Sequence, residues 1–449
     1  MSVAGEAGPR PRFVLTRNEI LAGGRLGGVA PEELVRRFGT PLYAYDLDAI
    51  ERQVEVLRAA LPAAIELAYA VKANPSLAVV AAMARLGLGA DVASGGELET
   101  AQRAGIVASS IVVTGPGKRD DELAGAVRAG VRAITVESPG ELDRLERIAA
   151  QMRSRVPVLL RAALATGDRP ERIRLVGDDG AGKFGMDPGD LRDAALRAVR
   201  STHLELLGLH AFAASNVLDP LAIADHVGST VAAAAGLARR IGFPLRLVDA
   251  GGGLGIPYEP DEAPLDLAAL GRRLRPLAET WAGDPVTRST RVLLEPGRFL
   301  VGPAGAYLAR VVDRKTVSGT VVIILDGGIH HLLRPALVRQ EHRIHVFGSG
   351  TRDAPARPVA IAGPLCSGLD VFARDRVLVP PDVGDLVAIL DAGAYGYTES
   401  MPFFLSHPTP AEVGLRGGRA ELLRPRLDPG EWLDRQRNPV WHERPARLD

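Results

Sequence analysis

The sequence predicts an α/β fold in which a (β/α)8 TIM barrel is followed by a C-terminal, mainly-β domain. Between residues 43 and 299, eight short apolar runs alternate with Ala-, Leu- and Arg-rich amphipathic stretches, and eight such units favour a closed barrel over an open doubly wound sheet. After about Leu300, strand-like runs follow one another with few helical stretches between them. Glycines and polar residues gather where the barrel strands end, which is where barrel active sites lie.

The barrel units can be followed in order along the chain. The apolar run at 65–73 is typical of a buried strand, and the stretch at 75–87 predicts the helix after it. A strand end at 89–94 is followed by a second helix from Gly95 to Ala104. The same alternation continues through IVVTGP, RAITVES, VPVLLRAAL, LELLGLHAF, LRLVDAGGG and RVLLEPGRF.

The second domain is predicted from the runs AYLARVVDRK, TVVIILDGG, HRIHVFG, ARPVAIAGP and DLVAILDAG. We therefore expect a segment 1–42 that packs with the β domain, the barrel at 43–299, and the β domain with a terminal tail at 300–449. The early run LYAYD at 42–46 could also belong to the β domain. The tail after Leu422 is expected to pack as a helical cap or across a dimer.

Composition restricts the partners and the compartment. Lys plus Arg and Asp plus Glu both number 54, so no net field attracts nucleic acid. The amino terminus lacks the pattern of a signal peptide, and no run of about 20 uninterrupted apolar residues appears, so we expect no membrane span and a cytoplasmic protein acting on a small molecule. The single cysteine, Cys366, excludes an intramolecular disulfide and fits a reducing compartment.

Three segments at strand ends carry candidate chemistry. Lys72 ends the first barrel strand, where desolvation is expected to lower its pKa and favour the neutral amine that a Schiff base needs; taken alone, it could be a surface lysine. The loop DAGGGLG at 249–255 could bring backbone N–H groups close to a phosphate, or form a plain tight turn. EPGR at 295–298 offers a carboxylate that could keep a pyridine nitrogen protonated, or a surface ion pair.

Taken together, these segments resemble the fold-type III pyridoxal-phosphate (PLP) decarboxylases, the family of diaminopimelate, ornithine and arginine decarboxylases. The ordered segments that carry the resemblance are YAVKANPS, GADVASGGEL, GKFGM, GLHAFAASN, DAGGGLG, EPGR, DGGIHHLLRPAL, GPLCSGLD and DAGAYG. Their order and spacing are most similar to diaminopimelate decarboxylases. The resemblance implies a PLP-binding barrel with a β domain like that of alanine racemase and ornithine decarboxylase, PLP as cofactor, PLP-dependent amino-acid decarboxylation, and a homodimer with shared active sites.

The resemblance also implies a role for each matching residue. Lys72 would form the internal aldimine, and Cys366, supplied across the dimer interface, would donate a proton to the product. Asp91, Ser94 and Glu97 would line the pocket near the ring, and Glu295 would pair with the pyridine nitrogen. The positions implied to bind the cofactor are Lys72, Asp91, Phe212, Ser215, Gly251, Gly252, Gly253, Glu295, Gly297, Arg298 and Tyr395. Those implied to bind substrate are Arg298, Arg334, Ser367 and Tyr395.

The sequence departs from the family pattern at three positions. Phe212 stands where most relatives have a histidine stacked on the PLP ring; it can stack but cannot donate a hydrogen bond. Ser367 stands where diaminopimelate decarboxylases have glutamate and ornithine decarboxylases have aspartate, the acid that recognises a distal ammonium. Val338 replaces a tyrosine that contacts the distal end of diaminopimelate.

These departures predict a carboxylate-bearing or conjugated amino acid as substrate, in a pathway of the siderophore or antibiotic kind. Diaminopimelate decarboxylation that yields L-lysine is the first alternative, and an amino-acid racemase or a non-catalytic regulatory homologue is the second. No metal site is expected. The histidines at 330, 331, 342 and 345 are predicted to be structural or surface residues rather than metal ligands, because they lack an accompanying acidic ligand or a helical i, i+4 register.

Overall fold

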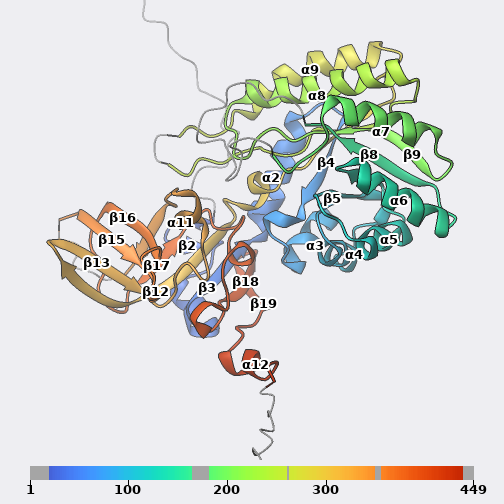
Figure 1. Ribbon diagram of the computed structural model, residues 1–449. Helices are drawn as coiled ribbons and strands as arrows, with labels where there is room; N and C mark the ends of the chain where they lie inside the picture. The colour runs from blue at the N-terminus through green and yellow to red at the C-terminus, as the bar shows by residue number, and fades with distance from the viewer. Residues whose placement is uncertain (1–19, 164–181, 260–261, 349–354, 438–449) are drawn as a thin grey trace, which may run out of the picture.

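The structure, a computed structural model, describes residues 20–163, 182–259, 262–348 and 355–437 (Figure 1). It has two parts, an α/β barrel and a mainly-β domain beside it. The amino terminus, where no signal peptide is expected, and Trp441 of the tail lie outside the described residues.

The barrel consists of eight parallel strands that close on themselves, as the sequence predicts. Strand β11 pairs with β4 and with β10, so the first and last units of the barrel meet. The strands are β4 (Ile65–Ala70), β5 (Gly89–Val92), β6 (Ile111–Val113), β7 (Ala133–Val136), β8 (Val156–Arg161), β9 (Leu204–His210), β10 (Leu247–Asp249) and β11 (Arg291–Leu294).

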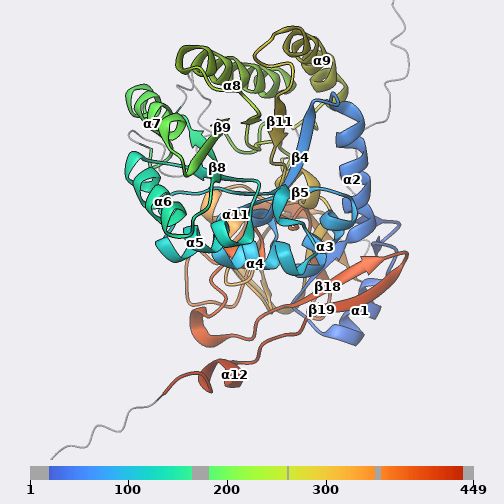
Figure 2. The ribbon, with the colours of Figure 1, turned by 90° about the vertical axis from the view of Figure 1, so that its right-hand side faces the viewer.

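Helices surround the barrel, and α3 to α9 lie between consecutive barrel strands, while α2 precedes the first strand and α10 follows the last (Figure 2). Ser94 and Ser138 begin two of them as N-caps, because each hydroxyl accepts the backbone N–H of the third helical residue at 3.1 Å. The helices are α2 (Leu47–Ala60), α3 (Leu77–Arg85), α4 (Gly95–Arg103), α5 (Asp120–Ala129), α6 (Pro139–Gln151), α7 (Pro188–Arg200), α8 (Pro220–Ile241), α9 (Leu267–Gly283) and α10 (Arg298–Val301).

Helix α8 is long and apolar enough to cross a membrane by length and composition. Half of its most apolar window is buried, and its buried positions pack toward β9 and β10. We therefore interpret α8 as a helix that covers the barrel, with its apolar face packed on the strands.

The barrel interior is filled by side chains rather than hollow. A separate cluster of apolar residues, all with an exposed fraction of 2% or less, comes from six of the eight strands. It comprises Ala68, Val112, Ala133, Leu159, Leu247 and Leu293. A filled core leaves the carboxyl ends of the strands as the place for a site.

The β domain is one nine-stranded sheet system that includes a strand from before the barrel. Strand β3 (Leu42–Asp46), the run LYAYD, pairs with β12 and β18, so it lies in this sheet. The other strands are β12 (Gly305–Val317), β13 (Thr320–Leu325), β14 (Ile344–Phe347), β15 (Arg357–Ala362), β16 (Val371–Leu378), β17 (Leu386–Ile389), β18 (Ala411–Arg416) and β19 (Arg419–Arg424). The domain limits themselves stay a prediction.

Short elements complete the β domain. They are β1 (Leu21–Ala22), β2 (Arg25–Leu26), α1 (Pro31–Phe38), α11 (Arg334–Val338) and α12 (Pro429–Leu433). In the tail, β19 extends to Arg424, and α12 places Trp432 against Phe403 with ring centroids 4.3 Å apart. The described part of the tail is thus partly strand and partly a short helix.

Candidate active site

One cavity lies at the carboxyl ends of the barrel strands and is closed by a loop of the β domain. The empty space between its lining atoms, including space open to solvent, is about 360 Å³. Its lining residues are Ala70, Lys72, Phe212, Ser215, Gly252, Gly253, Leu254, Glu295, Gly297, Arg298 and Tyr395. Every residue that the sequence places at the cofactor lines this cavity except Asp91 and Gly251. A larger hollow between α4 and α5, on the outer face of the barrel, holds none of them.

Lys72 lies on a single 3-10 turn, η1 (Val71–Ala73), that follows β4. Its Nζ donates to Asp91 at the end of β5, and the other oxygen of Asp91 accepts from the Thr114 hydroxyl after β6. Lost hydration lowers the pKa of Lys72, but the charges of Asp91 and Glu295 outweigh this and hold the pKa above its usual range. The expectation of a lowered pKa is therefore wrong for this structure, because the amine has buried carboxylate neighbours that the motif alone did not reveal.

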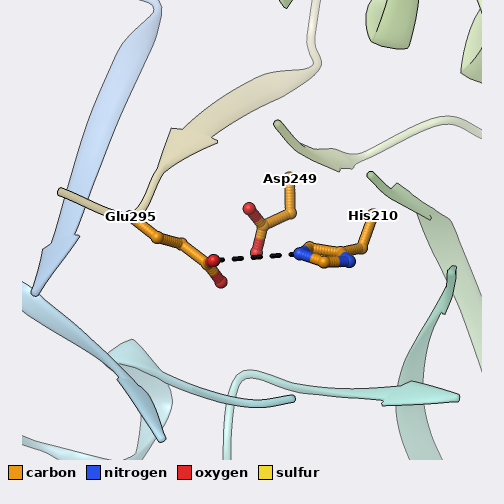
Figure 3. Close-up of side chains that lie close together, drawn as sticks. All are labelled: His210, Asp249 and Glu295. Carbon is orange, nitrogen blue, oxygen red and sulfur yellow. Dashed lines mark ion pairs between the residues drawn. The ribbon is translucent and has the colours of Figure 1, made fainter. Parts of the chain in front are cut away.

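Three buried side chains from neighbouring strand ends form a cluster, here called the floor of the cavity, of which only Glu295 is part of the cavity lining (Figure 3). His210 ends β9, Asp249 ends β10 and Glu295 follows β11; their exposed fractions are 2%, 0% and 4%. His210 Nε2 lies 3.8 Å from Glu295 Oε2. The possible ligand atoms all lie within 4.8 Å of one another, close enough for the ionisation of one carboxyl group to affect that of the other.

The two carboxyl groups of this cluster have opposite ionisation preferences. Burial raises the pKa of Asp249 well above its usual range, and the charge of Glu295 raises it further. Burial also opposes ionisation of Glu295, but its interactions with the neighbouring His210 and Lys72 hold its pKa at about 2. These directions favour a protonated Asp249 beside an ionised Glu295. These donor atoms could also hold a metal ion, although a carboxyl group that retains its proton is a poor metal ligand.

The opposite side of the cavity gathers hydrogen-bond donors. Gly251 and Gly253 have φ of +65° and +98°, and a Cβ on Gly252 would overlap the Glu295 carbonyl oxygen, so this loop needs glycine. Within the described residues, the amides of Gly252 and Gly253 make none of the hydrogen bonds observed. The Ser215 hydroxyl and the Arg298 guanidinium, joined at 3.2 Å, lie beside the same cavity. Free amides, a hydroxyl and a guanidinium are the groups that bind anions in proteins, so this side is called the anion-binding side of the cavity.

The outer end of the cavity is built around Tyr395, which comes from the β domain. Its backbone, held at φ 53°, donates to the Ala73 carbonyl at 2.7 Å, so the loop is fixed against the turn that carries Lys72. The guanidinium groups of Arg298 and Arg334 lie 4.7 and 4.9 Å from the Tyr395 ring centroid. Arg334 Nη1 also donates to both carboxylate oxygens of Glu399, at 3.2 and 2.9 Å.

Cys366 and Ser367 lie apart from this cavity within the single chain. They occupy the turn between β15 and β16, where Cys366 is exposed and Ser367 is partly exposed. The turn is shaped by the buried Asp370, which accepts the amides of Leu365 and Ile329 at 2.8 and 2.7 Å. Their expected roles are thus compatible with a second copy of the chain and stay predictions.

Several other side chains have structural partners. Glu97 accepts the Ala93 amide at 2.7 Å and so completes the N-terminal cap of α4 with Ser94, beside the pocket rather than on its lining. His331 and His342 are buried and bond to the carbonyls of Pro408 and Leu390. In His330, by contrast, neither buried ring nitrogen has a hydrogen-bond partner among the described residues.

Sequence reasoning missed the side chains that support the site from behind. His210 and Asp249 lie inside the segments GLHAFAASN and DAGGGLG, and their position at the last residue of a barrel strand was the available signal. Tyr258, whose hydroxyl accepts from Arg298 at 2.8 Å, gave no such signal because it lies in a loop, and neither did Glu399, which lies in a single 3-10 turn.

The cavity fits PLP on two observations. The anion-binding side suits its phosphate, and buried Glu295 lines the cavity with an oxygen, Oε1, that has no hydrogen-bond partner among the described residues. A buried carboxylate oxygen without a donor is costly, so a protonated ring nitrogen there would complete the site. Fold and site together define a class: a PLP enzyme built on an α/β barrel with a C-terminal β domain.

Comparison with known proteins identifies the family within this class of PLP enzymes. The family of the pyridoxal-dependent decarboxylases, through its pyridoxal binding domain, matches residues 47–302, and the chain belongs to this family. An L-glutamyl-[BtrI acyl-carrier protein] decarboxylase from Niallia circulans is 34% identical over 400 residues, covering 87% of this chain and 92% of that one. A diaminopimelate decarboxylase from Aquifex aeolicus is 34% identical over 402 residues, covering 89% and 92%. The crystal structure of the M. jannaschii diaminopimelate decarboxylase superposes with a TM-score of 0.83 at 28% identity, covering 91% and 95%.

The chain is therefore a PLP-dependent amino-acid decarboxylase of fold type III, with PLP as its cofactor. The relatives differ in substrate at equal identity, so the family assignment alone does not choose between a diamino acid and a carrier-bound acyl amino acid.

Proposed function

We propose that the enzyme decarboxylates a carboxylate-bearing or conjugated amino acid in a biosynthetic pathway of the siderophore or antibiotic kind. One observation carries the proposal: the guanidinium groups of Arg298 and Arg334 both lie on the ring of Tyr395, which lines the cavity, while a serine stands at position 367, where an acid would recognise a distal ammonium. Loss of a charge-assisted hydrogen bond weakens binding by about 1.5–3 kcal/mol. The resemblance to a decarboxylase of a carrier-bound glutamyl group supports the same substrate class.

Each part of the cavity has a proposed task. Lys72 would hold the cofactor covalently through Nζ, and Asp91 would position that nitrogen. Gly251, Gly252, Gly253, Ser215, Gly297 and Arg298 would hold the phosphate. Phe212 and Tyr395 would enclose the ring and the substrate, which keeps water from the reacting carbon.

Glu295 would keep the ring nitrogen protonated, since it is the carboxyl group of the floor that stays ionised. The bound cofactor supplies an electron sink for the bond that loses CO2. A proton must then reach the reacting carbon, and we assign its delivery to Cys366 of a second copy of the chain. The exposure of Cys366 agrees with this assignment.

A substrate panel tests the proposed function. CO2 release by the purified PLP-loaded enzyme is measured with meso-diaminopimelate, ornithine and arginine, and with acidic amino acids and their distal amide or thioester conjugates. We expect turnover of the acidic or conjugated compounds to exceed that of the diamino compounds by about 10-fold or more, the equivalent of one lost charged hydrogen bond. Fast diaminopimelate turnover would contradict the proposal.

Diaminopimelate decarboxylation is the second candidate. It is favoured by the identity to the Aquifex aeolicus enzyme, which equals that to the glutamyl-carrier enzyme. The same panel separates the two candidates, because L-lysine would be the product. Inverted substrate without CO2 would instead indicate racemisation.

We further propose a homodimer in which each active site combines Lys72 of one chain with Cys366 of the other. Lys72→Ala and Cys366→Ala proteins should each be nearly inactive. After subunit exchange at equal amounts, activity should recover to about a quarter of wild type, because half of the dimers are mixed and each mixed dimer has one intact site of two. Turnover before and after exchange is the measurement. An inactive mixture, in which differently tagged subunits are shown to have exchanged, would contradict the shared site.

A further inference from the structure

The two arginines at the outer end of the cavity are not both free positive charges, because nearby side chains already bind them. Arg298 is 4% exposed and already engaged by Tyr258 at 2.8 Å and by Ser215 at 3.2 Å on the anion-binding side. Arg334 is therefore the cation available to the distal end of a substrate. However, Glu399 binds Arg334 with both carboxylate oxygens.

The Arg334–Glu399 pair is held in place by its surroundings. The Leu333 amide donates to the Ser400 hydroxyl at 2.9 Å, which ties the start of α11 to the turn η4 (Tyr397–Glu399). The Ser400 hydroxyl in turn donates to the Gly396 carbonyl at 2.7 Å. With 13% of the Arg334 side chain and 32% of the Glu399 side chain exposed, the pair is partly shielded from water. A pair held by its framework and partly dry is weakened less by salt than a surface pair.

We infer that the Arg334–Glu399 pair determines specificity by selecting an amino acid whose distal end is an uncharged carbonyl, such as an amide or a thioester. This inference rests on the proposed function and narrows it. A free distal carboxylate would compete with Glu399 for Arg334 and meet its negative charge. A carbonyl oxygen needs no such exchange, since Arg334 has five N–H donors and Glu399 binds through Nη1.

The main alternative is a substrate whose distal end carries both a carboxylate and an ammonium group. The carboxylate could bind Arg334, and the ammonium group could bind Glu399. That arrangement requires the pair to separate, and each charge-assisted hydrogen bond lost must be replaced in the same partly buried space. The uncharged ligand leaves the pair intact. Glu399 therefore does not take over the role of the acid that relatives have at position 367. Its carboxylate neutralises Arg334 and is not available to a distal ammonium.

The test compares matched substrates in two variants. The PLP-loaded wild type, Glu399→Gln and Glu399→Ala are assayed for CO2 release with L-glutamate and L-2-aminoadipate, with the distal ethylamide and pantetheine thioester of each, and with meso-diaminopimelate. Glu341→Gln is the control, because Glu341 pairs with Arg376 at 3.8 Å and has a similar exposed fraction of 36%. Dissociation constants of the decarboxylated amines, measured by calorimetry, give a second readout that is independent of turnover.

Wild type should prefer the conjugates, and both Glu399 variants should lower the kcat/KM ratio of conjugate to free acid by about 10-fold, because Arg334 regains an unopposed charge. The amines should show the same shift in affinity, and Glu341→Gln should leave the ratio unchanged. An unchanged ratio in both Glu399 variants, with acids or conjugates still turned over, overturns this inference alone. If the wild type turns over only diaminopimelate, and Glu399→Gln loses that activity, both the inference and the proposed function are overturned.

Discussion

Replacing Lys72 with alanine is expected to abolish covalent attachment of PLP and to reduce CO2 release by about 10²–10⁴-fold or more, as for loss of a positioned reacting group. Lys72 is the amine that lines the cavity, and the hydrogen bond to Asp91 aims its Nζ across the end of β5. The fold should survive, because 43% of the side chain surface is exposed and the backbone turn η1 does not depend on it.

Borohydride reduction followed by intact-mass measurement checks this expectation. Wild type should gain the mass of one reduced cofactor, mapped to the peptide that contains Lys72, and Lys72→Ala should gain none. Lys315→Ala, which changes an exposed lysine on β12, is the matched control and should label like wild type. Label that persists on the Lys72→Ala chain would place the covalent site elsewhere and remove the basis of the proposed chemistry.

The apolar pattern predicted the barrel well because its physical signal is strong. Buried parallel strands such as β8 and β9 need near-continuous apolar runs, and the helices between them have their own period. Strands β16, β18 and β19 were not predicted. Strand β16, VFARDRVL, is charged and half exposed, while β18 and β19 meet at Gly417-Gly418, a turn signal that was available but not used.

The part of the site that could be predicted is the part that follows from closing the barrel. Once eight strands close, motifs far apart in sequence meet at one end, so Lys72, Ser215 and Glu295 share a cavity. The ionisation of Lys72 and the pairing of Arg334 with Glu399 were not predictable. Both depend on side-chain partners from other loops, 65 residues apart in the case of Arg334, and one sequence contains no information on such contacts.

The same kind of substitution should reduce activity far more at one carboxyl group of the floor than at the other. Glu295→Gln is expected to reduce kcat by about 10²–10³-fold, the usual effect of removing one electrostatic partner of a developing charge. A neutral amide cannot hold the ring nitrogen protonated, so the electron sink is weakened. Asp249→Asn should cost less than about 10-fold, because Asp249 already carries a proton and an amide resembles the neutral acid.

Steady-state CO2 release and the visible spectrum of the PLP-loaded protein, each recorded across pH, separate these effects. The contrast is sharp because both side chains are almost fully buried, with exposed fractions of 4% and 0%, so a packing defect would affect the two variants alike. Asp249→Asn should keep the wild-type spectrum, whereas Glu295→Gln should change it, since the charge opposite the ring nitrogen is gone. If Asp249→Asn proves as damaging as Glu295→Gln, then Asp249 is ionised in the working enzyme, and the floor holds two negative charges rather than one.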